Sequence, residues 1–383
     1  MKKKLFSVLL TAAMVLSLTA CGSSSTSSST AASSGATAAS SSASAVSSSE
    51  AVSSSETAEP TTDGEVYELT FSMHDAETAG TSQMIKAWGD EVEAASNGRI
   101  KFVWYFGGQI ASAMESMDAC TNGVCDLVWS APALFTGRFH TTLVASLPLL
   151  GVKTNAAGGE ALWNMYEKYD YVRDEWDGFK VIAIHPNGDT YMVTTNTKCD
   201  SVEAFSGLRV RTTTSSLVAF LSALDGVPTS FTATDTFENL EKNVADGTIA
   251  DANAIQTQHL YEICSYATET PINIAVGCIL MNENSYNSLP DDLKAIIDEY
   301  SGAYASKFAA EYMGNLAVEA KEDVASNGIE FYEFPDTMAD ALNAAAEAGR
   351  EAWYEEIAEF GYDGEQIYND FVAEMEAAES ANS

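Results

Sequence analysis

Hydrophobic and polar positions change between two periods along this chain. Apolar and polar residues alternate from Tyr67 to Phe71, as in a strand, whereas apolar residues from Met84 to Ala95 recur at helical spacing. Asn97-Gly98 ends that helix, and a second strand, a second helix and a third strand follow up to Trp129. Strands that alternate with helices in this way predict an α/β fold built on a parallel sheet.

The second half of the chain repeats this order. Strands are expected over 179–184 and 191–195, joined by a turn at 185–188, and again over 272–274 and 279–281. Pro290 starts a helical pattern that continues to Asn327-Gly328, which predicts one very long helix. Two more helices are expected around Trp353 and Phe371.

The first 64 residues follow a different pattern. Lys2 to Lys4, an apolar run up to Leu18 and then Cys21 predict a signal peptide over 1–20 and a lipid on the Cys21 thiol. The alternative is an ordinary signal peptide in which Cys21 has no role. Residues 21–64, rich in Ser, Ala and Thr, are expected to form a disordered tether above the membrane.

More than three hundred residues remain for the folded part, which exceeds the usual size of a single core. We therefore expect two lobes, with lobe 1 in 65–187 plus about 278–320 and lobe 2 in 188–277 plus about 321–383. In open α/β sheets a ligand binds beyond the carboxyl ends of the strands, which places a candidate site near His74, Phe106 to Gln109 and Trp129 to Pro132.

The charge balance is strongly acidic, with 55 Asp and Glu residues against 19 Lys and Arg residues. Nucleic acid is therefore excluded as an expected partner, and an anionic ligand would need locally concentrated positive groups. Five cysteines follow Cys21. The spacing of Cys120 and Cys125 permits a local disulfide, and buried thiols are the alternative.

Sequence motifs for enzymatic chemistry are missing. The chain contains no GxSxG, HExxH, GxGxxG or Walker sequence, and His140, His185 and His259 have no neighbours at metal-ligand spacing. We therefore expect no catalysis, no cofactor and no metal site.

Several short segments of the chain form a recognisable series: Asn97-Gly98-Arg99, Phe106 to Ile110, Gly123 to Asp126, Leu147-Pro148-Leu149, Phe205 to Arg211, Gly226-Val227-Pro228, Leu240 to Asp251 and Ser288-Leu289-Pro290. Taken together in this order, they resemble the substrate-binding subunits of tripartite ATP-independent periplasmic (TRAP) transporters. The resemblance implies a two-lobed clamshell of the periplasmic-binding-protein type (type II-like), with a long helix spanning both lobes. It also implies an extracytoplasmic receptor that delivers a small organic acid to small and large membrane subunits.

Arg211 is the first candidate ligand residue. The resemblance places it where the family holds the ligand carboxylate, and a planar guanidinium can donate two parallel hydrogen bonds to such a group. Thr212 to Ser216 lead into a predicted helix whose first amides could assist. The alternative is an ordinary ion pair. Arg209, two residues earlier, is interpreted as structural.

Five further residues are placed around the ligand. The resemblance places Asn253 near a family asparagine, and His74, Trp129, Asn187 and Gln256 are chosen from their predicted positions at strand ends, the 185–188 turn and a helix face. The alternatives are a solvated loop for His74, core packing for Trp129 and an exposed helix surface for Gln256. Members of the family that bind sialic acid carry another arginine shortly after the position of Gly188. This chain has Asp189 to Tyr191 there, which argues against sialic acid as the ligand.

The sequence is also compatible with two other functions. One is a solute-binding lipoprotein of the ATP-driven (ABC) uptake class, and the other is a ligand sensor for a membrane kinase. The Phe205 to Arg211 segment and the long helix after Pro290 favour the TRAP class. In each case we expect a protein outside the cytoplasm, anchored by lipid to the outer face of the cell membrane.

Overall fold

The computed structural model describes residues 64–135, 137–151 and 154–381. The predicted signal peptide, the lipid site at Cys21 and the tether up to residue 63 lie outside the described residues. Within the described part, no helix combines the length and the apolar character needed to cross a membrane.

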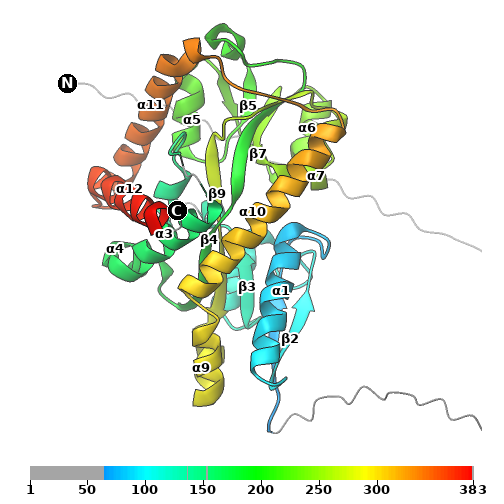
Figure 1. Ribbon diagram of the computed structural model, residues 1–383, viewed down its shortest axis with the longest axis vertical. Helices are drawn as coiled ribbons and strands as arrows, with labels where there is room; N and C mark the ends of the chain where they lie inside the picture. Colours follow the sequence, from blue (N-terminus) through cyan, green and yellow to red (C-terminus); the bar gives the residue numbers. More distant parts are fainter. Residues whose placement is uncertain (1–63, 136, 152–153, 382–383) are drawn as a thin grey trace, which may run out of the picture. The chain divides into compact units, whose positions relative to one another are not determined.

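A ten-stranded sheet runs through the described residues in the order β2-β1-β3-β9-β4-β7-β5-β6, with β8 and β10 joined beside β4 (Figure 1). The strands are β1 (Tyr67–Ser72), β2 (Ile100–Tyr105), β3 (Leu127–Ser130), β4 (Phe179–Thr194), β5 (Arg209–Arg211), β6 (Val227–Thr229), β7 (Gly247–Asp251), β8 (Tyr266–Thr268), β9 (Asn273–Asn282) and β10 (Glu330–Tyr332). The predicted α/β class is confirmed, but the sheet is mixed. Parallel strands β1–β3 and β5–β7 are joined through antiparallel β9 and β4.

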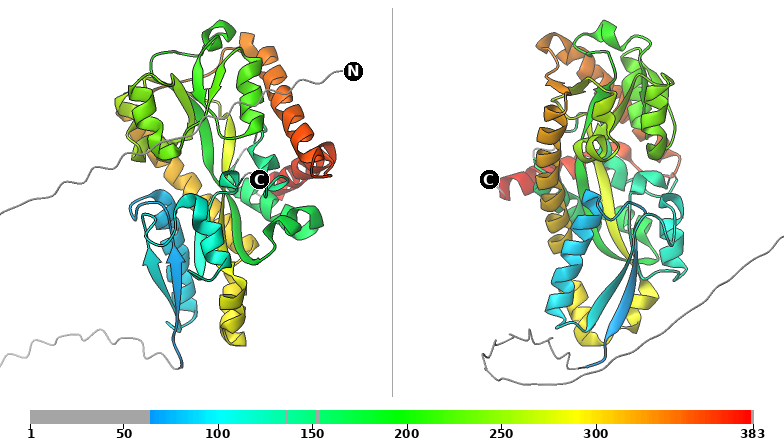
Figure 2. Two further views of the ribbon diagram at one scale, coloured as in Figure 1. Left: turned by 180° about the vertical axis from the view of Figure 1, so that it is seen from behind. Right: turned by 90° about the vertical axis from the view of Figure 1, so that its right-hand side faces the viewer.

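Helices accompany the sheet in the order expected for α/β units. They are α1 (Gly80–Ala95), α2 (Ser116–Thr121), α3 (Asn155–Lys168), α4 (Asp170–Arg173), α5 (Ser215–Ala223), α6 (Thr236–Glu241), α7 (Ala252–Thr257), α8 (Glu283–Ser288), α9 (Asp291–Glu299), α10 (Ala303–Ser326), α11 (Ala339–Ala358) and α12 (Gly364–Ala381). Helices α1 and α10 pack on the same side of the sheet, and α5 packs against α11 (Figure 2).

The predicted turn at 185–188 is wrong, because β4 is one strand of 16 residues that passes through it. Pro186 pairs with Val276 and Gly188 with Ala275 of β9, so Asn187 forms a bulge rather than a turn. The two short strands predicted over 272–281 are likewise one strand, β9. The pairing of β9 with Phe179 to Thr190 of β4 outweighs the local turn signal of the Pro-Asn-Gly sequence.

The predicted continuous helix from Pro290 to Asn327 is also wrong, because it is broken into α9 and α10. Gly302 lies at the break with φ 70°, a conformation that glycine adopts without strain, and its amide donates to the carbonyl of Ile182 at 2.7 Å. A side chain there would meet the Trp163 ring at 2.8 Å. The remaining helix α10 still has 24 residues and contacts α1, α3, β4 and α7.

The predicted lobe boundaries at 187/188, 277/278 and 320/321 therefore fall inside three long elements, β4, β9 and α10. The division into lobes at these positions stays a prediction. The buried hydrophobic residues of the described chain group into four clusters, and β4 supplies residues to each of them: Val181 and Ile184, Ile182 and Ala183, Met192, and Tyr191 and Val193.

Cys120, Cys125, Cys199, Cys264 and Cys278 are buried free thiols. The disulfide that the spacing of Cys120 and Cys125 permits is therefore not formed. Burial raises the pKa of all five thiols, to about 12 for Cys125, which keeps them protonated and poorly reactive at neutral pH.

Candidate ligand-binding site

Arg211 ends β5, and its guanidinium is partly buried without an acidic partner. Its Nε donates to the carbonyl oxygen of Phe231 at 2.9 Å, and the guanidinium carbon lies 5.9 Å from the centre of the Phe231 ring. No ion pair joins Arg211 to a carboxylate among the described residues. Burial lowers the pKa of Arg211, yet a guanidinium stays charged in proteins. The strand therefore ends in a desolvated cation whose remaining donors are available to an anion.

Arg209 on the same strand is fully engaged. Its Nε and Nη2 donate to the two carboxylate oxygens of Asp246 at 2.8 and 2.6 Å, and its Nη1 donates to the carbonyl of Asn243 at 2.7 Å. This geometry accords with the structural role expected for Arg209.

Three aromatic side chains form a row at the carboxyl ends of β1 and β3. The ring centres of His74 and Trp129 are 5.5 Å apart, and those of Trp129 and His185 are 6.5 Å apart. Trp129 is 4% exposed, so its packing in the core is substantial, whereas the side chain of His74 is 16% exposed at the outer end of the row. The structure thus brings together two of the residues predicted from the sequence and adds His185.

Several candidate residues carry buried polar atoms without partners. Among the described residues, His74 Nδ1, Asn187 Oδ1, Asn253 Nδ2 and Thr229 Oγ1 are buried and make no hydrogen bond, and the same holds for Ser82 Oγ and His140 Nε2 elsewhere in the fold. The great majority of buried polar atoms in folded proteins have a partner, so each of these four atoms requires an explanation. Three of them belong to residues predicted to contact a ligand, and Thr229 pairs with Arg211 between β6 and β5.

The loop after β1 approaches the start of α7. A Cβ atom added to Gly80 would lie 3.7 Å from Oδ1 of Asn253, so the two segments are in close contact. Asp251 caps α7 by accepting a hydrogen bond from the amide of Ala254 at 2.9 Å, and Asp75 accepts one from the Thr81 hydroxyl at 2.7 Å. Burial, with a smaller contribution from the nearby Asp75 carboxylate, raises the pKa of Asp251 to about 6.

Sequence reasoning did not single out Asp75, His185 or Asp251 as site residues. An Asp that precedes the first residue of a helix is a capping signal, which could have placed Asp251 at a strand-to-helix junction. Nothing in the sequence places the Asp75 and Asp251 carboxylates close together, because they come from separate βα units.

The side chain of Gln256 forms a hydrogen bond on the exposed surface. Its amide donates to Asp323 of α10 at 2.8 Å. This contact corresponds to the exposed-helix alternative, and we leave Gln256 out of the candidate site. Among the described residues, no hydrogen bond, ion pair or ring contact joins Arg211 to His74, Trp129 or Asn253, so we describe the candidate site as two parts, one around Arg211 and one around the aromatic row.

Three pockets lie near these elements. The N-terminus of α5, expected to assist Arg211, opens instead on a pocket of 330 Å³ that includes Phe135, His140 and Trp353 but not Arg211. Phe106, Gly107 and Gln109 line an open pocket of 460 Å³, in the strand-end loop predicted from the sequence.

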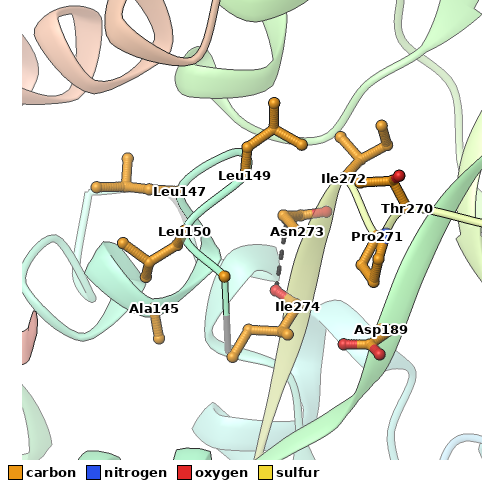
Figure 3. A pocket seen from close by; sticks show the side chains of 11 residues that line it. Ala145, Leu147, Leu149, Leu150, Asp189, Thr270, Pro271, Ile272, Asn273 and Ile274 are labelled. Carbon is orange, nitrogen blue, oxygen red and sulfur yellow. Dashed lines mark hydrogen bonds between the residues drawn. The ribbon is translucent and has the colours of Figure 1, made fainter. Parts of the chain in front are cut away.

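The third pocket measures 190 Å³ and lies beside β4 and β9 (Figure 3). Ala145, Leu147, Leu149 and Leu150 form one side of it, and Thr270 to Ile274 with Asp189 form the other (Figure 3). None of the six predicted ligand residues lines this pocket, so we do not include it in the candidate site.

The family profile of the bacterial extracellular solute-binding proteins, family 7, matches residues 71–358. This match covers most of the described chain, and the chain therefore belongs to that family. A Haemophilus influenzae protein without a known function is 26% identical over 204 residues, which are 53% of this chain and 56% of that protein. The match thus spans little more than half of the relative. The C4-dicarboxylate-binding periplasmic protein DctP of Rhodobacter capsulatus is 24% identical over 249 residues, 63% of this chain and 72% of the relative.

Solved structures show the same fold. A TRAP solute-binding protein from Rhodoferax ferrireducens, in complex with copurified benzoate, superposes with a TM-score of 0.78 at 24% identity, covering 83% of this chain and 100% of its own. A TRAP periplasmic solute-binding protein from Bordetella bronchiseptica with bound mandelate gives a TM-score of 0.73 at 24% identity, covering 81% and 99%. The two-lobed α/β fold predicted from the sequence is therefore confirmed, and members of this family act outside the cytoplasm as solute-binding proteins rather than enzymes.

Proposed function

We propose that this protein is an extracytoplasmic receptor that binds a small organic acid and delivers it to the membrane subunits of a TRAP transporter. The observation that carries the proposal is Arg211, a partly buried guanidinium with no carboxylate partner among the described residues. The relatives support the ligand class, since they are described with benzoate, mandelate or a C4-dicarboxylate.

The proposed mechanism follows from the position of these groups. The ligand carboxylate accepts hydrogen bonds from Arg211, and the rest of the ligand contacts His74, Asn187 and Asn253, whose buried polar atoms lack partners. A ligand that bridges both parts of the site binds a closed arrangement better than an open one and shifts the equilibrium toward closure. Trp129 forms the wall behind His74.

Titration calorimetry with small carboxylates, neutral sugars and amides tests the proposal. We expect a carboxylate to bind and Arg211→Gln to weaken its binding about 10- to 100-fold, since hydrogen bonds to charged groups contribute about 1.5–3 kcal/mol. Arg209→Gln is the matched control, because it removes an arginine from the same strand that is already paired with Asp246. Binding of neutral compounds alone, or equal affinities in wild type and Arg211→Gln, contradicts the proposal.

We also propose that the Cys21 thiol carries the lipid that holds the receptor at the outer face of the cell membrane. The support is the sequence of residues 1–21. Cys21→Ala should move the protein from the membrane fraction to the soluble fraction of the producing cells. An unchanged distribution argues against lipid attachment at this residue.

A sensor that passes a ligand signal to a membrane kinase is the second candidate. It requires the same binding chemistry, and deletion of this chain with the transporter subunits left in place distinguishes the two: ligand uptake stops if the chain serves transport and continues if it serves signalling.

A further inference from the structure

The side chains around the candidate site differ in charge between its two parts. The Arg211 part holds a cation beside the Phe231 ring. The other part, between the loop after β1 and the start of α7, holds the carboxylates of Asp75 and Asp251. The contacts place the two carboxylates near each other: Asp75 accepts a hydrogen bond from Thr81, and a Cβ on the neighbouring Gly80 would lie 3.7 Å from Asn253, two residues after Asp251. A ligand that spans both parts therefore meets a positive group at one end and negative groups at the other.

This asymmetry bears on how many carboxylates the ligand carries. A carboxylate bound to Arg211 is favoured, whereas a second carboxylate directed toward Asp75 and Asp251 meets like charges in a partly buried place, which costs several kcal/mol in general. A hydroxyl or an apolar edge meets no such repulsion, and a hydroxyl can donate to either carboxylate.

The aromatic side chains of the candidate site indicate the shape of the ligand apart from its carboxylate. His74 and Trp129 present a pair of rings 5.5 Å apart, and Trp129 is fixed from behind by His185. Phe231 adds a ring beside Arg211. Flat side chains pack best against another flat group, with ring centres about 4.5–7 Å apart. The outermost ring, His74, is the only partly exposed member of the His74, Trp129 and His185 row.

We infer that the ligand is a monocarboxylate built on a flat, aromatic ring, and that the Asp75 and Asp251 carboxylates select against dicarboxylates. The inference rests on the proposed function, because it names the ligand class of the same site. It assigns two roles: the His74 ring, supported from behind by Trp129, receives the ring of the ligand, and Asp75 and Asp251 discriminate against a second negative charge.

Calorimetry with four acids tests the inference: benzoate, 3-hydroxybenzoate, cyclohexanecarboxylate and succinate. Cyclohexanecarboxylate is the control for benzoate, since it has the same number of carbons and one carboxylate without a flat ring. We expect the two benzoates to bind at least about tenfold more tightly than succinate, and more tightly than cyclohexanecarboxylate.

Two variants assign the effects to residues. His74→Ala should weaken benzoate binding about two- to tenfold and change cyclohexanecarboxylate binding less. Asp75→Asn should strengthen succinate binding at least about threefold, whereas Asp340→Asn, the same change of charge at an exposed position in α11, should leave it unchanged.

The outcomes separate this inference from the proposed function. If succinate binds more tightly than the benzoates, or if Asp75→Asn leaves succinate binding unchanged, the inference is wrong while the receptor for organic acids stands. If cyclohexanecarboxylate binds as tightly as benzoate, the site does not recognise the flat ring of the ligand, and that part of the inference is wrong. If no acid binds to the wild type, the proposed function fails together with the inference.

Discussion

The indole Nε1 of Trp129 donates a hydrogen bond to Nε2 of His185 at 3.2 Å in the buried interior. Nε2 must therefore accept, so the proton of the neutral His185 ring lies on Nδ1, which is 2.9 Å from the carbonyl oxygen of Pro186. Burial lowers the pKa of His185 to about 4, and the ring is neutral at ordinary pH. The imidazole thus links the bulged part of β4 to the ring that supports His74.

His185→Leu should lower the free energy of unfolding by about 1–3 kcal/mol, because it leaves the buried indole N–H of Trp129 without an acceptor. His185→Gln offers a carbonyl oxygen in its place and should lose less. Denaturant unfolding followed by fluorescence measures both. Equal stabilities of the Leu and Gln variants at residue 185 would refute this role of the hydrogen bond.

The raised pKa of Asp251 predicts a loss of stability as the pH rises. The folded protein holds this proton more tightly than the unfolded chain, so the stabilising contribution is complete below 3.8, the ordinary pKa of Asp, and is lost as the pH rises through about 6. Asp251→Asn removes the titration and keeps a good helix cap. The melting temperature of Asp251→Asn minus that of the wild type should therefore be larger at pH 7 than at pH 4.5. The same difference at both pH values would contradict the raised pKa.

Gly277→Ala should destabilise the protein. An added Cβ would lie 2.9 Å from ring atoms of both His185 and Trp129, and neither buried ring has room to move away. Overpacking of this kind costs about 1–3 kcal/mol, which denaturant unfolding detects. Gly314→Ala inside α10 is a matched control, since its Cβ meets only the side chain of Asn155 at 3.0 Å and alanine favours a helix. A neutral Gly277→Ala would show that the two rings are free to shift.

The sequence was most informative where local pattern and tertiary contacts agree. The alternation before Ser72 and the helical spacing after Gly80 predicted β1 and α1 closely, because each element buries the face that its pattern marks. The same reasoning failed at Pro186-Asn187-Gly188, where local turn residues sit in a strand held by its neighbour, and at Gly302, where a single glycine breaks a continuous helical pattern.

Prediction of the candidate site had a similar limit. Strand-end positions identified His74 and Trp129, which the structure places in contact, and the choice of Arg211 over Arg209 accords with the pairing of Arg209 to Asp246. The proximity of Asp75 and Asp251 could not be predicted, since it depends on how two distant βα units pack. For Gln256, helical spacing could not decide between the ligand site and an exposed helix surface. The hydrogen bond to Asp323 of α10 shows that its side chain lies on the exposed surface.

The participation of β4 in all four hydrophobic clusters has a consequence for cooperativity. Because one strand contributes side chains to every cluster, we expect the described chain to unfold in one all-or-none transition. For the same reason, we expect any opening or closing around a ligand to occur by bending of β4 and β9, with their hydrogen bonds kept. The bulge at Asn187, which interrupts the regular pairing, is the place where such bending requires the least distortion.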